Sequence, residues 1–423
     1  MRRVVITGVG VVAPGAVGIK NFWALLTSGR TATRNITLFD ATGYRSRIAA
    51  EVDFDPAAHG FNLADTERLD RVAQFALVSA REAVADAGLT EVLDDRPLRC
   101  GVSLGSAVGC VTGLATQYGL LSDYGNTWAV DHAKAADCLF DYFVPSSLAA
   151  VVARDSGAQG PAGVVSSGCT SGLDAIGHAA ELIREGSADV MIAGGAEAPI
   201  SPIAMACFDR IQLTSPRNEE PGTASRPFDR TRDGFVLGEG AAVVILEELE
   251  HARRRGANAY AELSGFATYS SAHHMTGLRP GGQEMADAIR AALDEARLNP
   301  VDVDYVNAHG AGTRHNDRHE THAFKLGLGE HARRVPVSSI KSMIGHALGA
   351  AGALDVAASV LTIQHSTVPP TANLHQPDPT CDLDYTPLFA REHRTSAVLS
   401  VASGFGGFHA ATVLTRPRLR EAA

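Results

Sequence analysis

The chain has 423 residues, of which 45% are apolar and 20% are charged. That composition suffices for a large buried core and excludes a disordered chain. The formal net charge of −10 argues against a surface that binds nucleic acid. The 42 glycines are scattered without a period, which favours an α/β protein with many tight turns between strands and helices.

The N-terminal segment VVITGVGVVA (4–13) predicts a buried first strand, because it is rich in β-branched residues. A signal peptide is the alternative for this apolar stretch after Met1-Arg2-Arg3, but its glycines and β-branched residues favour the strand. Gly8-x-Gly10-x-x-Ala13 also fits a dinucleotide-binding fingerprint, although the next residue is a proline and no acidic residue completes the unit. No apolar run is long and unbroken enough to span a bilayer.

The cysteines include no CxxC pair, and their spacing suits neither a zinc site nor a disulfide framework. They stand at positions 100, 110, 138, 169, 207 and 381. A reducing compartment, the cytoplasm, is therefore expected.

The sequence contains a weak internal duplication. The pattern RxAxxxAxL occurs at 81–89 and 290–298, and each copy predicts an amphipathic helix that leads to a strand and a turn. Three further pairs of segments correspond in order: GVSLGS (101–106) with YVNAHG (305–310), 165–167 with 337–339, and 192–198 with 401–407. We therefore expect two pseudo-equivalent α/β halves, residues 1–255 and 256–423. Extra segments at about 107–160 and 199–235 are expected to cover the site or a subunit interface.

The segment GVSLG (101–105) fits the GxSxG elbow of serine hydrolases. The duplication explains it better as the first-half counterpart of NAHG (307–310). We therefore do not expect Ser103 to be a nucleophile.

Cys169 follows an apolar strand and begins a helix pattern rich in small residues, GCTSGLDAIG. At a helix N-terminus, unsatisfied N–H groups and the helix dipole favour the thiolate. A lone cysteine is more often a small buried apolar residue, so its position alone does not make it a nucleophile.

Two histidines stand at turns of the second half, and the turn that holds His346 mirrors the cysteine turn. His309 ends the predicted strand DYVNAHG, and His346 lies five residues after Lys341 in SIKSMIGHALGAAG. Each could be a structural residue by itself. A thiol and two imidazoles at equivalent turns of a duplicated α/β unit, however, suit acyl transfer through a thioester, with hydrogen-bond donors for an enolate or oxyanion.

A third group of histidines, His315, His319 and His322, has spacing that could place them on one face of a helix. The spacing is not the HExxH pattern of zinc enzymes, so a solvated or subunit-contact face is favoured over a metal site.

These motifs resemble the β-ketoacyl synthases of the thiolase superfamily. The resemblance rests on the cysteine turn GCTSGLD, RPFDRTRDGFVLGEGAAVVILE (226–247), NAHGAGT, SIKSMIGHALGAAG and SGFGGF, and it extends from Arg3 to about Leu414. Within the family, GCTSGLD and HGAGTRHNDRHET look most like the ketosynthase-α subunit of bacterial type II polyketide synthases. The resemblance implies the thiolase fold, an α/β fold with two pseudo-duplicated βαβαβαββ halves in α-β-α-β-α layers.

The resemblance also implies a mechanism, a decarboxylative Claisen condensation that elongates a polyketide, of the aromatic type in this subfamily. Cys169 would carry the acyl chain, and the backbone N–H groups of Cys169 and Phe405 would form the oxyanion hole. His309 and His346 would stabilise the enolate that forms when malonyl-carrier protein loses CO2. No organic cofactor or metal is implied, since the substrates are carried on the phosphopantetheine arm of acyl carrier protein.

Other positions match the family's supporting residues. Lys341 and Glu320 would form a charge pair that orients His309, and Phe405 would be the gate between acylation and extension. Thr276 and Thr313 match positions that bind the pantetheine arm. Two positions depart from the pattern: Ala311 replaces a hydroxyl residue, which removes one pantetheine contact, and Ser167 replaces a threonine.

The resemblance implies two protein partners, an acyl carrier protein and a chain-length subunit that forms a heterodimer with this chain, or a homodimer without it. Arg68 and Arg71 are candidates for contacting the acidic carrier protein, with ordinary surface arginines as the alternative.

Three alternative functions remain within the superfamily. A fatty-acid-type β-ketoacyl synthase shares the same machinery. A thiolase uses a second cysteine near the C-terminal turn, which here reads SGFGGF without one. A non-catalytic chain-length subunit lacks the nucleophile that Cys169 provides.

Overall fold

The first strand, β1 (Val4–Ala13), lies in the middle of the strand order and joins the two halves of the molecule. It pairs antiparallel with β9 (Gly240–Glu248) on one side and with β10 (Ala261–Ser270) on the other. The computed structural model describes residues 2–89 and 96–417. All ten residues of β1 are buried, which confirms the prediction of a buried first strand.

The first half is built as βαβαβαββ. Its elements in chain order are β1, α3 (Arg71–Ala87), β5 (Cys100–Gly105), α7 (Ser147–Ser156), β6 (Ala162–Val165), α8 (Ser171–Arg184), β7 (Val190–Glu197) and β9. Its strands lie in the order β6-β5-β7-β9-β1, with β5 parallel to both neighbours.

The second half repeats this arrangement. Its elements are β10, α11 (Gln283–Ala296), β11 (Tyr305–Asn307), α12 (Arg314–Leu328), β12 (Val337–Ser338), α14 (Ala351–His365), β15 (Ala397–Gly404) and β16 (Phe408–Thr415). The strand order β12-β11-β15-β16-β10 is the same as in the first half, strand for strand. The sequence correspondences therefore fall on equivalent strands: β5 with β11, β6 with β12, and β7 with β15.

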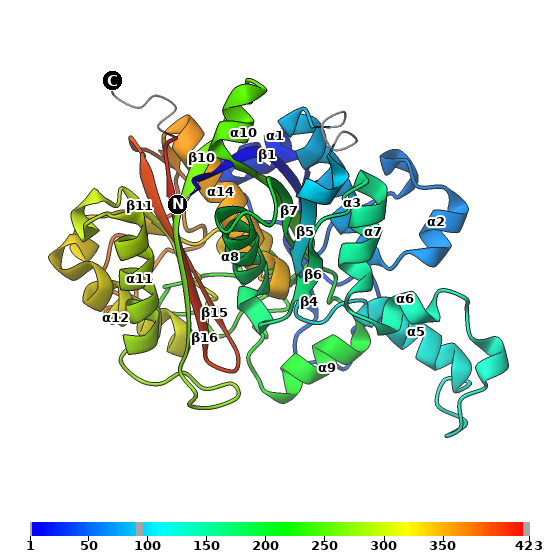
Figure 1. Cartoon of the computed structure of the whole chain (residues 1–423). Coiled ribbons are helices and arrows are strands. Elements are labelled where there is room, and N and C mark those ends of the chain that lie inside the picture. The colour runs from blue at the N-terminus through cyan, green and yellow to red at the C-terminus, as the bar shows by residue number, and fades with distance from the viewer. Residues whose placement is uncertain (1, 90–95, 418–423) are drawn as a thin grey trace.

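The helices and strands form five layers, α-β-α-β-α (Figure 1). Helices α3 and α7 cover the outer face of the first half, and α11 and α12 cover that of the second half. Helices α8 and α14 pack against each other between the halves. Residues 351–363 of α14 are all buried, which explains why this helix is apolar around its whole circumference. This is the expected thiolase fold. The boundary at residue 255 stays a prediction, because the strands of both halves continue into one sheet through β1 and β10.

The glycines of the N-terminal fingerprint have a packing role. A Cβ atom on Gly10 would lie 2.0 Å from the carbonyl oxygen of Ser79 in α3, so only glycine lets this helix approach β1 so closely. The segment is therefore a strand under a helix and not a nucleotide-binding turn.

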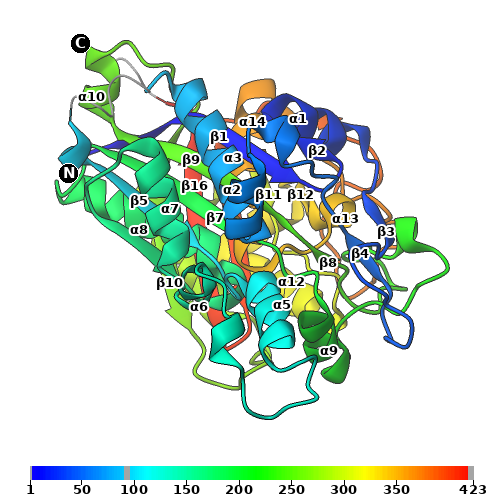
Figure 2. The same cartoon turned by 90° about the vertical axis from the view of Figure 1, so that its right-hand side faces the viewer.

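Shorter elements surround this frame. They are β2 (Ala16–Val17), α1 (Ile19–Ser28), β3 (Thr33–Asn35), β4 (Ile48–Ala50), α2 (Leu63–Arg68), α5 (Val111–Leu121), α6 (Leu139–Phe143), α9 (Pro202–Arg210), β8 (Leu237–Gly238), α10 (Leu249–Arg254), α13 (Lys341–Ile344), β13 (Thr367–Val368) and β14 (Arg391–Glu392). Helices α5 and α6 belong to the 107–160 segment and extend away from the layered body (Figure 1), on the side that faces the viewer in Figure 2. Of the helices that the structure describes, none has the length and apolar character needed to cross a membrane.

Candidate active site

Cys169 lies in a turn of 3-10 helix, Gly168–Thr170, between β6 and the start of α8. The turn is closed by Ser171, whose hydroxyl donates to the carbonyl of Gly168 at 2.6 Å and accepts from the N–H of Ser167 at 3.0 Å. These bonds place the thiol at the helix N-terminus, as the sequence predicted, with the residue 7% exposed.

Burial has a stronger effect on the Cys169 thiol than the helix N-terminus has. Burial raises the pKa of Cys169 to about 12, and the nearby Glu197 carboxylate acts in the same direction. Lys341 and the backbone N–H groups of Phe405 and of Cys169 itself act against this increase. The helix N-terminus alone therefore does not make Cys169 a thiolate, because burial outweighs its effect and favours the thiol.

His309 and His346 meet in the same cavity as Cys169. His309 follows β11, and His346 follows α13 in the loop that mirrors the cysteine turn. Their rings lie edge to face, with centroids 5.1 Å apart, and both residues are buried. Burial, with the added effect of Lys341, lowers the pKa of His346 to about 3 and that of His309 well below its usual value. Both imidazoles are therefore neutral and can donate an N–H without carrying charge.

Glu320 and Lys341 do not form the predicted ion pair. Glu320, in α12, accepts hydrogen bonds from the backbone N–H groups of His309 at 2.5 Å and Gly310 at 2.8 Å. The Lys341 ammonium is 2.7 Å from Oδ2 of Asp355 in α14. Thus Glu320 still positions His309, but through its backbone, and the partner of the buried lysine is Asp355.

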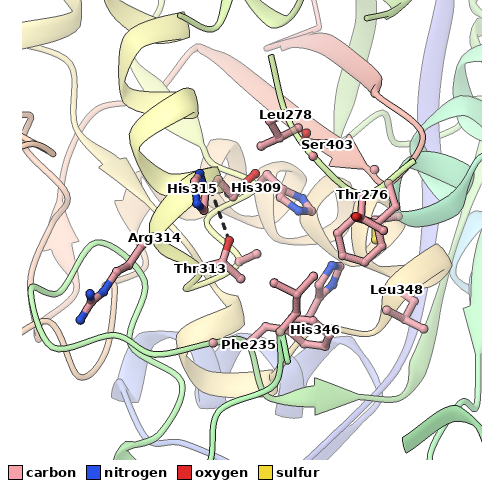
Figure 3. Close-up of a pocket in the computed structure, with 18 of the residues that line it drawn as sticks. Phe235, Thr276, Leu278, His309, Thr313, Arg314, His315, His346, Leu348 and Ser403 are labelled. Atoms are coloured by element: carbon pink, nitrogen blue, oxygen red, sulfur yellow. Dashed lines mark hydrogen bonds between the residues drawn. The ribbon is translucent and has the colours of Figure 1, made fainter. Parts of the chain in front are cut away.

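The cavity has a volume of about 510 Å³. Six of the ten predicted site residues line it: Cys169, His309, His346, Phe405, Thr276 and Thr313. Figure 3 shows both histidines, Thr276 and Thr313 around the same space. The Thr313 hydroxyl accepts from the N–H of Asn316 at 3.3 Å and so caps α12, which leaves its own proton available for a ligand. Ala311 also lines the cavity, at the position where a hydroxyl was expected.

Arg68 and Arg71 have different surroundings. Arg68 is exposed and pairs with Asp141 at 3.4 Å. Arg71 binds the buried carboxylate of Glu239 at 2.6 Å and the carbonyl of Val52 at 2.8 Å. The carrier-protein contact stays a prediction for both residues, although the Arg71 guanidinium already binds Glu239 and Val52.

Ser103 and the three histidines of α12, which from sequence are candidates for a nucleophile and for metal ligands, lie in surroundings that favour neither role. The Ser103 hydroxyl donates to the carbonyl of Ala175 at 2.8 Å from within a buried strand. His319 is buried and stacks on His409 with centroids 5.1 Å apart, while His315 and His322 are exposed. Within the part of the chain that the structure describes, no three His, Cys, Asp or Glu side chains gather as a metal site would need. The six cysteines are free thiols.

Sequence reasoning missed several residues of the site. Phe235 contacts the His346 ring edge-on at 5.6 Å, Leu348 lines the cavity, and Asp355 and Glu197 are the nearby buried carboxylates. One signal was present, because Asp355 is the single charged residue in an otherwise apolar helical run. A buried charge in such a run needs a partner.

The fold is a duplicated five-layer α/β fold. Its site holds a buried cysteine and a neutral histidine after the equivalent strands β6 and β12, and a second neutral histidine after β11. These features define a thiolase-fold enzyme of the acyl-condensing type. Residues 1–252 match the β-ketoacyl synthase N-terminal domain, and residues 260–375 match the β-ketoacyl synthase C-terminal domain. The chain belongs to the β-ketoacyl synthase family.

Relatives and solved structures agree with this assignment. The tetracenomycin polyketide synthase ketoacyl synthase alpha subunit of Streptomyces glaucescens is 61% identical over 417 residues, which cover 99% of this chain and 98% of that protein. A chain in the structure of a type II polyketide synthase acyl-carrier protein in complex with its ketosynthase, bound to the hexaketide, is 38% identical. Its TM-score is 0.92, covering 98% of this chain and 100% of that chain. The ishigamide ketosynthase/chain length factor gives a TM-score of 0.88 at 34% identity, over 98% of this chain and 99% of that chain.

Proposed function

We propose that this protein is the condensing ketosynthase-α subunit of a type II polyketide synthase. The observation that carries the proposal is the single cavity in which the Cys169 thiol lies beside two buried, neutral imidazoles. This combination offers one nucleophile and two uncharged hydrogen-bond donors. A condensation through a thioester needs those groups.

In the first half-reaction, the sulfur of Cys169 attacks the thioester carbonyl of an acyl-carrier protein. The thiol proton passes to the departing pantetheine sulfur, so that the carrier leaves as a free thiol and the acyl chain stays on the cysteine. The tetrahedral oxyanion accepts from the backbone N–H groups of Cys169 and Phe405. The contact of both groups with the thiol supports this assignment.

In the second half-reaction, malonyl-carrier protein enters the same cavity. His309 and His346 donate to its thioester oxygen, and the bond to the carboxylate breaks with loss of CO2 to leave an enolate. The enolate carbon attacks the Cys169 thioester and displaces the sulfur as a thiolate, which takes up a proton from water to regenerate the thiol. The product is a β-ketoacyl chain on the carrier protein, two carbons longer.

The remaining site residues support these steps. Glu320 holds the backbone at His309, and Lys341, which is paired with Asp355, helps keep both imidazoles neutral. Phe405, on the turn between β15 and β16, is the gate between acylation and extension. Thr276 and Thr313 bind the pantetheine arm as it passes along the cavity. These steps need no organic cofactor or metal beyond the arm of the carrier protein.

The partners are an acyl carrier protein and a chain-length subunit, with a homodimer where that subunit is missing. The 107–160 segment supports a protein partner, because it exposes large aromatic side chains: Tyr124 at 80%, Trp128 at 96%, and Phe140 and Phe143 at 70%. Strand β6, the edge of the sheet, also exposes Ala162 and Gly163. The place of action is the cytoplasm and the product is an aromatic polyketide.

The test is reconstitution of the purified chain with the chain-length partner, a carrier protein and a malonyl donor. We expect release of CO2 and a poly-β-ketone on the carrier protein, both absent with Cys169→Ala. A single two-carbon extension of a saturated acyl group would favour the fatty-acid-type enzyme. Extension from coenzyme A esters without CO2 release would favour a thiolase.

A further inference from the structure

Glu197, the last residue of β7, is a fully buried carboxylate that the steps above do not use. Its Oε1 accepts from the Ser106 hydroxyl at 2.9 Å and the Val108 N–H at 3.2 Å. Its Oε2 accepts from the Ala107 N–H at 2.6 Å and the Gly349 N–H at 2.9 Å. Each oxygen therefore accepts two hydrogen bonds, the full complement of an ionised carboxylate.

These donors belong to two loops that flank the nucleophile. Ala107 and Leu348 pack in the same apolar cluster as Cys169, and Leu348 also lines the catalytic cavity (Figure 3). Leu348 has φ of +42°, a left-handed conformation that is unfavourable for leucine and needs support from its surroundings. The adjacent Gly349 N–H bond to Glu197 supplies that support.

Position 349 requires glycine because the backbone there lies too close to Glu197 and Ala107 for any side chain. A Cβ atom there would lie 2.5 Å from Oε2 of Glu197 and 2.4 Å from the backbone nitrogen of Ala107. The loop around 348–349 therefore closes directly onto the carboxylate and the 106–108 loop.

We propose that Glu197 is a positioning residue for acylation: it holds the 106–108 and 348–349 loops against Cys169 and presents its negative charge to the thiol. The inference rests on the proposed function for the identity of the acyl substrate. Its physical content, two loops held by one buried anion beside the nucleophile, does not depend on the substrate.

The charge on Glu197 acts on the Cys169 thiol. Burial raises the pKa of Glu197 to about 7, against the effect of its hydrogen-bond donors. The carboxylate in turn raises the pKa of Cys169, while Lys341 lowers it. Removing the anion therefore lowers the pKa of the thiol, whereas loosening a loop without removing the charge does not.

The test compares Glu197→Gln with Ser106→Ala and with a matched control, Glu51→Gln, in the full chain. Glu51 is also a buried carboxylate that accepts from two backbone N–H groups, those of Thr37 and Leu38, but it lies outside the cavity lining. The readouts are the pH profile of Cys169 alkylation by iodoacetamide and the rate of Cys169 acylation by an acyl-carrier protein.

In Glu197→Gln, one carboxylate oxygen is replaced by an NH2 group, which cannot accept hydrogen bonds from the N–H and O–H donors that face it. We therefore expect the two loops to move apart. We expect acylation to slow by about 10² and the alkylation midpoint to move to lower pH by about one unit. Ser106→Ala keeps the charge and loses one donor, so acylation slows by a smaller factor with the midpoint unchanged. Glu51→Gln changes neither readout.

An unchanged alkylation midpoint in Glu197→Gln would overturn the proposal even if acylation slowed, because a merely structural role would change the rate alone. If Glu197→Gln does not fold, Ser106→Ala decides: an acylation rate equal to that of the unaltered chain overturns the proposal. Failure of the proposed function can be distinguished from failure of this proposal. If the proposed function is wrong, the unaltered chain is not acylated by the carrier protein, but the pH profiles of Cys169 alkylation still show whether Glu197 acts on the thiol.

Discussion

The ammonium of Lys341 and the carboxylate of Asp355 lie 2.7 Å apart, with side chains only 2% and 1% exposed. Burial raises the pKa of Asp355 to about 6, and Lys341 acts against that increase. The lysine also lowers the pKa of both catalytic histidines. This pair therefore links α14 to the electrostatics of the decarboxylation site.

Asp355→Asn tests the buried pair. The substitution leaves the lysine without a compensating charge, so we expect a loss of about 3–5 kcal/mol in the free energy of unfolding. Asp155→Asn is the control, because Asp155 pairs with the half-exposed Arg81 at the surface, where a loss below about 1 kcal/mol is expected. Urea unfolding measures both variants, and equal losses would contradict the assignment.

Glu320→Gln tests the backbone tether of His309. Its amide presents an N–H to one of the two N–H donors at 309 and 310, so the imidazole shifts. We expect decarboxylation of malonyl-carrier protein to slow by about 10², with Cys169 alkylation unchanged. Decarboxylation at the rate of the unaltered chain would show that the tether does not position His309.

The depressed pKa of His346 predicts a pH-dependent contribution to stability. The folded value is about 3 and the usual value is 6.5, so the unfolded chain takes up the proton first. The contribution is fully present above pH 6.5 and is lost as the pH falls towards 3. The stability advantage of the unaltered chain over His346→Gln should therefore shrink by about 1 kcal/mol between pH 6.5 and 5.5. Urea unfolding at both pH values checks this, and a constant difference would mean that His346 titrates normally.

Arg71 and Arg68 should respond differently to removal of the charge. Arg71→Met leaves the buried Glu239 carboxylate without its charged partner. We expect a loss of about 3–5 kcal/mol in the free energy of unfolding. Arg68→Met breaks only an exposed pair, with a loss below about 1 kcal/mol. If Arg68 contacts the carrier protein, its variant raises KM for the carrier substrate at unchanged kcat. A stable Arg71→Met variant would contradict the interior role.

The exposed aromatic residues of the 107–160 segment predict where a partner subunit binds. Trp128→Glu should weaken assembly with the chain-length subunit without changing the free energy of unfolding, since Trp128 is 96% exposed. Leu63→Glu is the control, because Leu63 is also exposed, at 74%, but lies in α2, outside the segment. Sedimentation of co-purified subunits measures assembly, and equal assembly of both variants would place the interface elsewhere.

The fold could be predicted from the sequence because each half of the duplication carries its own short, recognisable helix and strand patterns. Helix patterns at 81–89 and 290–298 and matching strand ends determine the order of elements, and Cys169, His309 and His346 each stand at such an end. Cys169 and His346 follow the equivalent strands β6 and β12, and His309 follows β11, which pairs with β12; the three side chains share one cavity.

Two kinds of feature could not be predicted from the sequence: ion pairs between residues that are distant in the chain, and the degree to which a side chain is buried. Nothing local shows that Lys341 pairs with a residue of the next helix rather than with Glu320, or that Arg71 points inward to Glu239. The prediction that Cys169 stands at a helix N-terminus is confirmed. The pKa of its thiol, however, depends mainly on burial by loops that are distant in the sequence. Glu197 lies in the 192–198 segment of the duplication, but its role depends on donors at positions 106–108 and 349, which are far apart in the sequence.

The most direct test of the account is mass spectrometry of the purified chain with its chain-length partner, after exposure to acyl- and malonyl-carrier protein. We predict an acyl adduct that maps to Cys169 and grows in two-carbon steps when malonyl-carrier protein is supplied. No adduct on Cys169 with the partner present would contradict the assignment of this cysteine as the nucleophile and point to a non-catalytic subunit.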